Sequence, residues 1–166
     1  MGRAVRAGLV PETAERLDYH VHAHLDVFLN GVAQTVPAGL GINTADPGVH
    51  RFVVDGKVGY GGIRPPCRQP CISPLHTHDV TGILHTESAT AVSNTLGQLF
   101  VEWGVQLTPT CVGGYCTPSW SIGIYIDGHS RSGDPRSIAL SDHREIAIVI
   151  GASPSKIPAT ADWSKI

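Results

Sequence analysis

The chain has 166 residues and a formal net charge of -2; 42% of its residues are hydrophobic and 16% are charged. This length suits one domain with a substantial core. The near-neutral charge and lack of a basic run argue against nucleic acid or an anionic membrane surface as partner. No apolar run reaches the roughly 18 residues of a transmembrane helix, so we expect no membrane insertion of this chain. We expect one domain over residues 19–151, between an N-terminal lead-in (1–18) and an extended C-terminal arm (152–166).

Alternation of polar and apolar side chains is clearest in residues 19–29, which predicts a strand with one apolar face. Asn30-Gly31 follows it and favours a tight hairpin turn, because both residues tolerate a positive φ. Residues 32–36 would then return antiparallel to the first strand.

The polar face of this strand carries three alternating histidines. His20, His22 and His24 would project on the same side, with successive side chains about 6.5–7 Å apart. Neighbouring imidazoles at this spacing could reach one metal ion. His20 is the weakest candidate of the three, because it stands at the start of the strand, where fraying is expected.

A second histidine-rich stretch, Leu-His-Thr-His-Asp-Val-Thr-Gly-Ile-Leu-His-Thr-Glu-Ser, covers residues 75–88. The loop before it, residues 63–74, holds four prolines and can be neither a helix nor a central strand. We expect this loop to present His76. Residues 83–88 are predicted to form a strand with His85 and Glu87 on one face.

Together the two stretches predict a metal centre, because imidazole suits Zn, Cu and Fe. The candidate ligands, of which three or four would bind the ion, are His22, His24, His76, His78 and His85. Glu87 and Asp79 are the candidate catalytic carboxylates, able to accept a proton from metal-bound water or to orient a ligating histidine. The expected cofactor is a divalent transition metal, Zn or Cu first and Fe as a further alternative.

Residues 93–104 form the one main helix that the sequence predicts. Its apolar positions recur at helical spacing, at Leu96, Leu99, Phe100 and Trp103. Ser93 or Thr95 can cap its start, and Gly104 is a good C-terminal stop. Glu102 is expected on the solvated face of this helix.

The order of elements favours an α+β fold that is mostly β. Further strands are predicted at residues 120–127 and 145–150, with a short return strand over 135–140. The lead-in is predicted as a short helix over 11–17 or as a flexible segment. This order suggests a mixed sheet of hairpins with one main helix, in a β-grasp-like arrangement. A small β-barrel or jelly roll is the alternative, because so little helix is predicted.

The four cysteines fall in two close pairs, Cys67 with Cys71 and Cys111 with Cys116, in loops rich in Pro or Gly. An even count in a loop-rich chain predicts disulfides and an oxidising compartment, although the sequence does not choose among the possible connectivities. A four-cysteine zinc site is the alternative, since both gaps match ligand spacing.

The motifs His-x-His-x-His-Leu-x-Val-Phe-x-Asn-Gly (residues 20–31) and Leu-His-Thr-His-Asp-x-x-Gly-x-x-His-x-Glu-Ser (residues 75–88) carry a resemblance. With them, residues 19–151 resemble a family of small histidine-rich bacterial and archaeal domains, often secreted or membrane-anchored. The resemblance implies an extracytoplasmic location, periplasmic or secreted, and histidines that act together. It specifies no reaction, and because the sequence starts without a leader, a cytoplasmic location is the alternative.

Three functions remain open from the sequence. The first is a metal-dependent enzyme, hydrolytic with Zn or oxidative with Cu or Fe. The second is an extracytoplasmic metal carrier or sensor with a full set of ligands. The third is an interaction module in which a metal is only structural.

Overall fold

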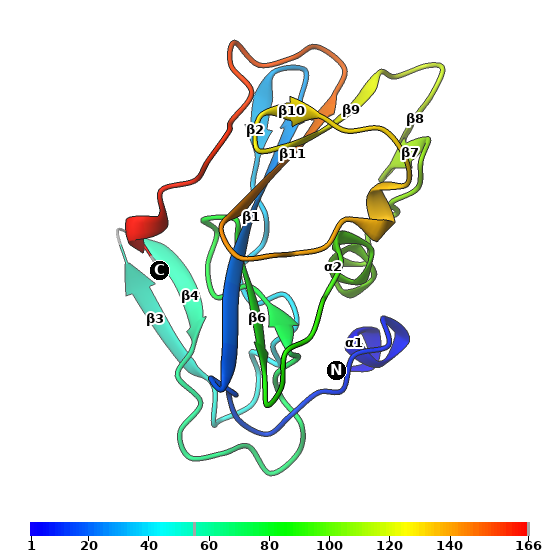
Figure 1. Ribbon diagram of the computed structural model, residues 1–166. Coiled ribbons are helices and arrows are strands. Elements are labelled where there is room, and N and C mark those ends of the chain that lie inside the picture. Colours follow the sequence, from blue (N-terminus) through cyan, green and yellow to red (C-terminus); the bar gives the residue numbers. More distant parts are fainter. Residues whose placement is uncertain (55, 166) are drawn as a thin grey trace.

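The computed structural model describes residues 1–54 and 56–165 of the chain (Figure 1). Strands hold 34% of the residues and helices 11%. In chain order the elements are α1 (Gly2–Arg6), β1 (Tyr19–Leu29), β2 (Val32–Gln34), β3 (His50–Val54), β4 (Lys57–Gly61), β5 (Leu75–His76), β6 (Ile83–Ser88), α2 (Leu96–Trp103), β7 (Cys111–Val112), β8 (Tyr115–Cys116), β9 (Ile122–Ile126), β10 (His129–Ser130), the 3₁₀ turn η1 (Pro135–Ser137), β11 (Arg144–Ile150) and the 3₁₀ turn η2 (Trp163–Lys165).

A mixed sheet of seven strands, in the order β10-β9-β11-β1-β6-β5 with β2 also paired to β1, organises the chain. β1 runs parallel to β11 on one side; on the other it pairs antiparallel with β6 along its first half and with β2 along its second half. The mixed sheet and low helix content confirm the predicted α+β fold that is mostly β. The path ends at β10 and at β5, so the described strands form no closed barrel.

The core lies between one face of this sheet and α2. Leu25 of β1 and Ile148 of β11 are buried in the same cluster as Leu99 and Phe100 of α2. In Figure 1, α1 and α2 lie to one side of β1, and the hairpin β3–β4 lies to the other with the C-terminal turn. The sheet therefore separates an apolar core face from a second face that the helices do not cover.

The predicted signals at the ends of α2 are confirmed. Thr95 and Gln98 form a reciprocal capping box, which satisfies two backbone N–H groups at the start of the helix. Gly104 ends the helix with φ 76°, a left-handed conformation that a glycine adopts without strain.

The predicted return strand over residues 135–140 is wrong. β10 returns immediately after β9 instead, and η1 starts at Pro135. The side chain of Asp134 accepts a hydrogen bond from the backbone N–H of Arg136, and the fixed φ of Pro135 suits the first position of a helical turn.

Two further local predictions are wrong. Residues 11–17 form no helix, because the backbone of Glu12 makes a β-bridge with Ile72 and ties this segment to the proline-rich loop. Glu102 is not solvated but only 4% exposed. The helix α1 packs over this side of α2, and Arg3 Nη1 donates to the backbone carbonyl of Glu102.

The cysteines are paired within each close pair, as Cys67–Cys71 and Cys111–Cys116, and the described residues include no free cysteine. Disulfides, and not a four-cysteine zinc site, are therefore what the structure contains. Cys67 and Cys71 are buried in a small second core together with Ile72. Among the described residues, no helix has the length and apolar character needed to span a membrane.

Candidate metal centre

Strand pairing brings the two histidine-rich stretches together on the face of the sheet opposite the core. In the antiparallel pair β1–β6, His22 lies opposite His85 and His20 lies opposite Glu87. In the pair β5–β6, His76 also lies opposite His85. Residues directly opposite each other share a face of the sheet, so the imidazoles and the carboxylate converge as the sequence predicts.

His76 is fully buried and its two ring nitrogens have different roles. Nδ1 lies 2.9 Å from the backbone oxygen of Ser73. A carbonyl only accepts hydrogen bonds, so Nδ1 carries a proton, and in the neutral ring Nε2 presents a lone pair. Nε2 has no hydrogen-bond partner among the described residues and lies 3.5 Å from Oε1 of Glu87.

His78 is held in the same way from another element. Its Nδ1 donates to the backbone oxygen of Tyr60 in β4 at 2.6 Å, so in the neutral ring Nε2 carries the lone pair that can bind a metal. Histidines that bind metals commonly donate the other ring N–H to a backbone carbonyl, which fixes the tautomer and the orientation of the ring. His76 and His78, the two histidines of the Leu-His-Thr-His motif, are therefore both held as metal-binding histidines commonly are, with Nδ1 donating to a backbone carbonyl.

Glu87 is 3% exposed and stands among three imidazoles. Its Oε1 lies 3.2 Å from His20 Nε2 and 3.8 Å from His85 Nδ1, in addition to the contact with His76. Burial by itself would raise the pKa of this carboxyl, but the neighbouring imidazoles, His76 above all, lower its pKa below the ordinary value. A carboxylate anion thus lies within the cluster.

Three imidazoles of the cluster, those of His22, His78 and His85, have pKa values below the ordinary value. Burial, and then the nearby His76, lowers the pKa of His78. Burial followed by the proximity of the other histidines, first His76, lowers the pKa of His85 strongly. Burial and then His20 lower the pKa of His22. Neutral imidazole is the form that ligates, so burial and mutual repulsion prepare these rings for a metal ion.

Among the described residues, three groups of side chains have donor atoms within 4.8 Å of one another: His76, His78, His85 and Glu87; His20, His22 and His85; and His24, Asp26 and Glu145. The first two groups share His85. They contain four of the five histidines predicted as ligands, and His20, the weaker candidate, joins them.

No protein-family model, curated protein or solved structure matches the chain. The chemistry of these groups is therefore the guide to function, and the family resemblance of the two motifs stays a prediction.

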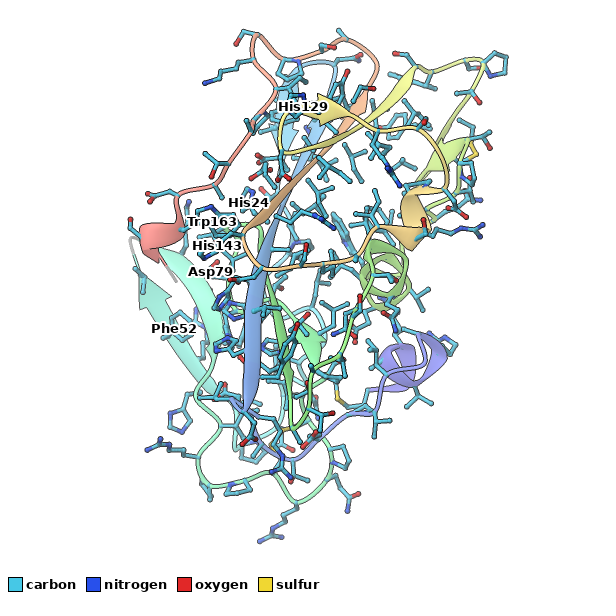
Figure 2. The ribbon with its side chains drawn as sticks, viewed as in Figure 1. His24, Phe52, Asp79, His129, His143 and Trp163 are labelled. Atoms are coloured by element: carbon cyan, nitrogen blue, oxygen red, sulfur yellow. A yellow bond between two sulfur atoms is a disulfide. The ribbon has the colours of Figure 1, made fainter. Side chains whose placement is uncertain are left out.

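His24 lies in the third group, apart from the other predicted ligands. Its Nδ1 is 2.8 Å from Glu145 Oε2, and its Nε2 donates to the backbone oxygen of Thr81 at 2.8 Å. Burial would lower the pKa of His24, but the hydrogen bond to Glu145 and the charge of that carboxyl raise it overall. Trp163 approaches His24 edge-on and stacks on His143, and Figure 2 shows these three side chains grouped beside β1. Both nitrogens of His24 are thus engaged within the protein.

Asp79, the second predicted catalytic carboxylate, holds a turn. Its Oδ1 accepts hydrogen bonds from the backbone N–H and the hydroxyl of Thr81. It lies outside the three groups, although it lines the pocket beside them. Glu145 is a buried carboxylate that the sequence analysis missed, since only the pairing of β11 with β1 places it beside His24.

A surface pocket of about 490 Å³ borders the first two groups. Its lining includes the polar side chains of His20, His78, His85 and Glu87 and the apolar side chains of Leu17, Phe52, Val54 and Ile83. Figure 2 shows Phe52 on β3, on the side of β1 away from the helices. The cluster is therefore reachable from solvent on one side although His76 is fully buried.

Proposed function

We propose that this chain is a metal-binding protein. It holds a divalent transition metal, Zn²⁺ or Cu²⁺ in the first place, at His76, His78, His85 and Glu87. The donor set supports these metals, because imidazole nitrogen with one carboxylate oxygen suits Zn and Cu, and also Fe.

The observation that carries the proposal is the buried Nε2 of His76. With Nδ1 occupied by the Ser73 carbonyl, only Nε2 is left to face the carboxylate oxygen of Glu87, which lies 3.5 Å away, beyond normal hydrogen-bond distance. Nε2 has no hydrogen-bond partner among the described residues, and buried polar atoms without partners are costly. A metal ion bound to Nε2 and to the Glu87 carboxylate would remove this cost.

The pocket beside the cluster favours a metal-dependent enzyme as the second candidate function. A substrate could approach His78, His85 and Glu87 from this side. In this candidate the three histidines would hold zinc and leave one position for water, whose pKa bound zinc lowers toward neutrality. Glu87, ionised beside the imidazoles, would then accept the proton. A carrier or sensor would use the same ligands without a substrate.

We further propose an extracytoplasmic location, periplasmic or secreted. The two disulfides support it, because disulfides persist in oxidising compartments and are rare in the cytosol of most organisms. Among the described residues no cysteine belongs to the metal groups, so reduction of the disulfides would not itself remove a metal ligand.

Titration of the metal-free protein, prepared without a His tag, tests the proposed site. Isothermal titration calorimetry with Zn²⁺ and Cu²⁺ is expected to show that His78→Ala and His85→Ala each weaken binding by more than about 100-fold, because each removes a ligand from the ion. His129→Ala is the matched control, since this exposed histidine lies far along the sheet from the cluster (Figure 2). Parent-like affinity in both site variants would show that these histidines are not ligands.

A further inference from the structure

The donors on this face exceed what one tetrahedral ion can use. Two of the groups together contain five imidazoles and one carboxylate, and they have only His85 in common. A four-coordinate zinc ion takes four ligands. One ion would leave His20 and His22 crowded at its edge without a role, with ring centroids 4.3 Å apart.

Distances around His20 match a second ligand set. His20 Nε2 lies 3.3 Å from His85 Nδ1 and 3.2 Å from Glu87 Oε1, and these last two atoms are 3.8 Å apart. Ligand atoms bound to one tetrahedral zinc ion at bond lengths of about 2.0–2.1 Å are themselves about 3.3 Å apart. The three atoms therefore form a triangle close in size to one face of a metal coordination tetrahedron.

Glu87 is placed between the two groups. Oε1 is near His20 on one side and near His76 on the other, at 3.2 and 3.5 Å. Oε2 is also buried and has no hydrogen-bond partner among the described residues. A carboxylate with one oxygen beside both groups and the other free can bind two ions at once.

We propose that the site is a dinuclear metal centre, in which His20 and His22 hold a second divalent transition metal ion, Glu87 is shared with the first ion and His85 binds one of the two. The inference rests on the proposed function, since it adds an ion to the same centre. Ions in two-metal protein sites lie about 3.5–4 Å apart and act together on one substrate group. His20 of the second group and His78 of the first line the same pocket, so both ions would face one substrate.

Metal stoichiometry tests the inference. The tag-free full-length chain is stripped with a chelator, loaded with excess Zn²⁺ or Cu²⁺ and desalted, and the metal content per chain is measured by elemental analysis and native mass spectrometry. The parent is expected to retain two ions and the His20→Ala/His22→Ala variant one. The single variant His20→Ala, at an exposed residue, serves as a second test if the double variant unfolds, and His129→Ala is the control.

In the copper-loaded parent, magnetic coupling between neighbouring Cu²⁺ ions is expected to lower the electron paramagnetic resonance spin count below the copper content, whereas the double variant gives the full count.

The other outcomes overturn one claim or both. One ion in the parent that is lost in His78→Ala overturns the dinuclear centre and leaves the proposed function standing. No retained ion in the parent overturns both. Two ions in both the parent and the His20/His22 variants, or none in those variants, overturns the assignment of His20 and His22 to a second ion.

Discussion

At the scale of single residues, three buried glutamates show how the surroundings set the charge of a carboxyl group. Glu87 faces imidazoles, which lower its pKa, and Glu145 shares a hydrogen bond with His24. Glu102 lies close to Ser73, but neither of its carboxyl oxygens has a hydrogen-bond partner of good geometry among the described residues. Burial raises the pKa of Glu102 to about 7. Isolated buried carboxyl groups take up a proton rather than stay charged, so Glu102 is a source of instability above neutral pH.

Glu102→Gln is therefore expected to stabilise the protein at high pH. The unfolded chain ionises with a pKa near 4.5 and the folded chain only near 7, so the free energy of unfolding of the parent falls as pH rises through this window. A shift of this size corresponds to about 3 kcal/mol. Urea unfolding at pH 8 should show the variant more stable by up to that amount, with a smaller difference at pH 5. Asp18→Asn at an exposed position is the control, and an equal difference at both pH values would contradict the assignment.

At the scale of elements, the alternation in residues 19–29 predicted β1 correctly, and with it the face that carries the histidines. Helical spacing and capping residues likewise predicted α2. His24 shows the limit of such patterns. Alternation with period two places His24 on the same face as His22, but it does not reveal which strand pairs with the other edge of β1. The parallel register of β11 sets Glu145 opposite His24 and draws this histidine away from the metal cluster. Register between strands distant in sequence depends on the whole sheet, so no local pattern contains it.

The proline-rich loop before β5 provides a prediction about an element. Cys71 precedes Ser73 by two residues, and the Ser73 carbonyl fixes the ring of His76. Replacing Cys67 and Cys71 with alanine should loosen this carbonyl and weaken Zn²⁺ binding by about 10-fold or more. Replacing Cys111 and Cys116 is the matched control: the sequence separations, 4 and 5, are similar, so either change should cost roughly 2 kcal/mol of stability by chain entropy.

Calorimetric titration and thermal unfolding of both double variants separate the two effects. Equal losses of stability with a loss of affinity only in the Cys67/Cys71 variant are expected. Parent-like zinc affinity in a folded Cys67/Cys71 variant would show that the loop does not need its disulfide to position His76.

At the scale of the whole molecule, the two faces of the sheet carry different kinds of side chains. One face is apolar and is closed by α2, and the other gathers imidazoles and carboxylates from β1, β5, β6 and β11. The sequence predicted the mixed sheet and the two stretches that meet on it. It did not predict that β4 supplies the carbonyl that orients His78, because residues 57–61 lack a strong strand pattern and their role depends on how the hairpin folds back over the sheet. Burial on this second face also changes the expected response of the centre to pH.

Ordinary imidazoles, with a pKa of about 6.5, would lose metal affinity steeply below about pH 6. Two such ligands would cost about 100-fold between pH 7.5 and pH 5.5, because a proton must leave each ring before the metal binds. In this protein burial and neighbouring histidines lower the pKa of both His78 and His85, so these rings stay neutral at pH values where free histidine is protonated. Zn²⁺ affinity measured by calorimetry in a non-coordinating buffer is therefore expected to change by less than about 10-fold between pH 7.5 and pH 5.5. Circular dichroism at each pH would establish that the fold is retained, and a peptide of residues 75–88 provides the unburied comparison. A loss of about 100-fold or more in the folded protein, as expected for unburied imidazoles, would show that burial does not protect these ligands from protons.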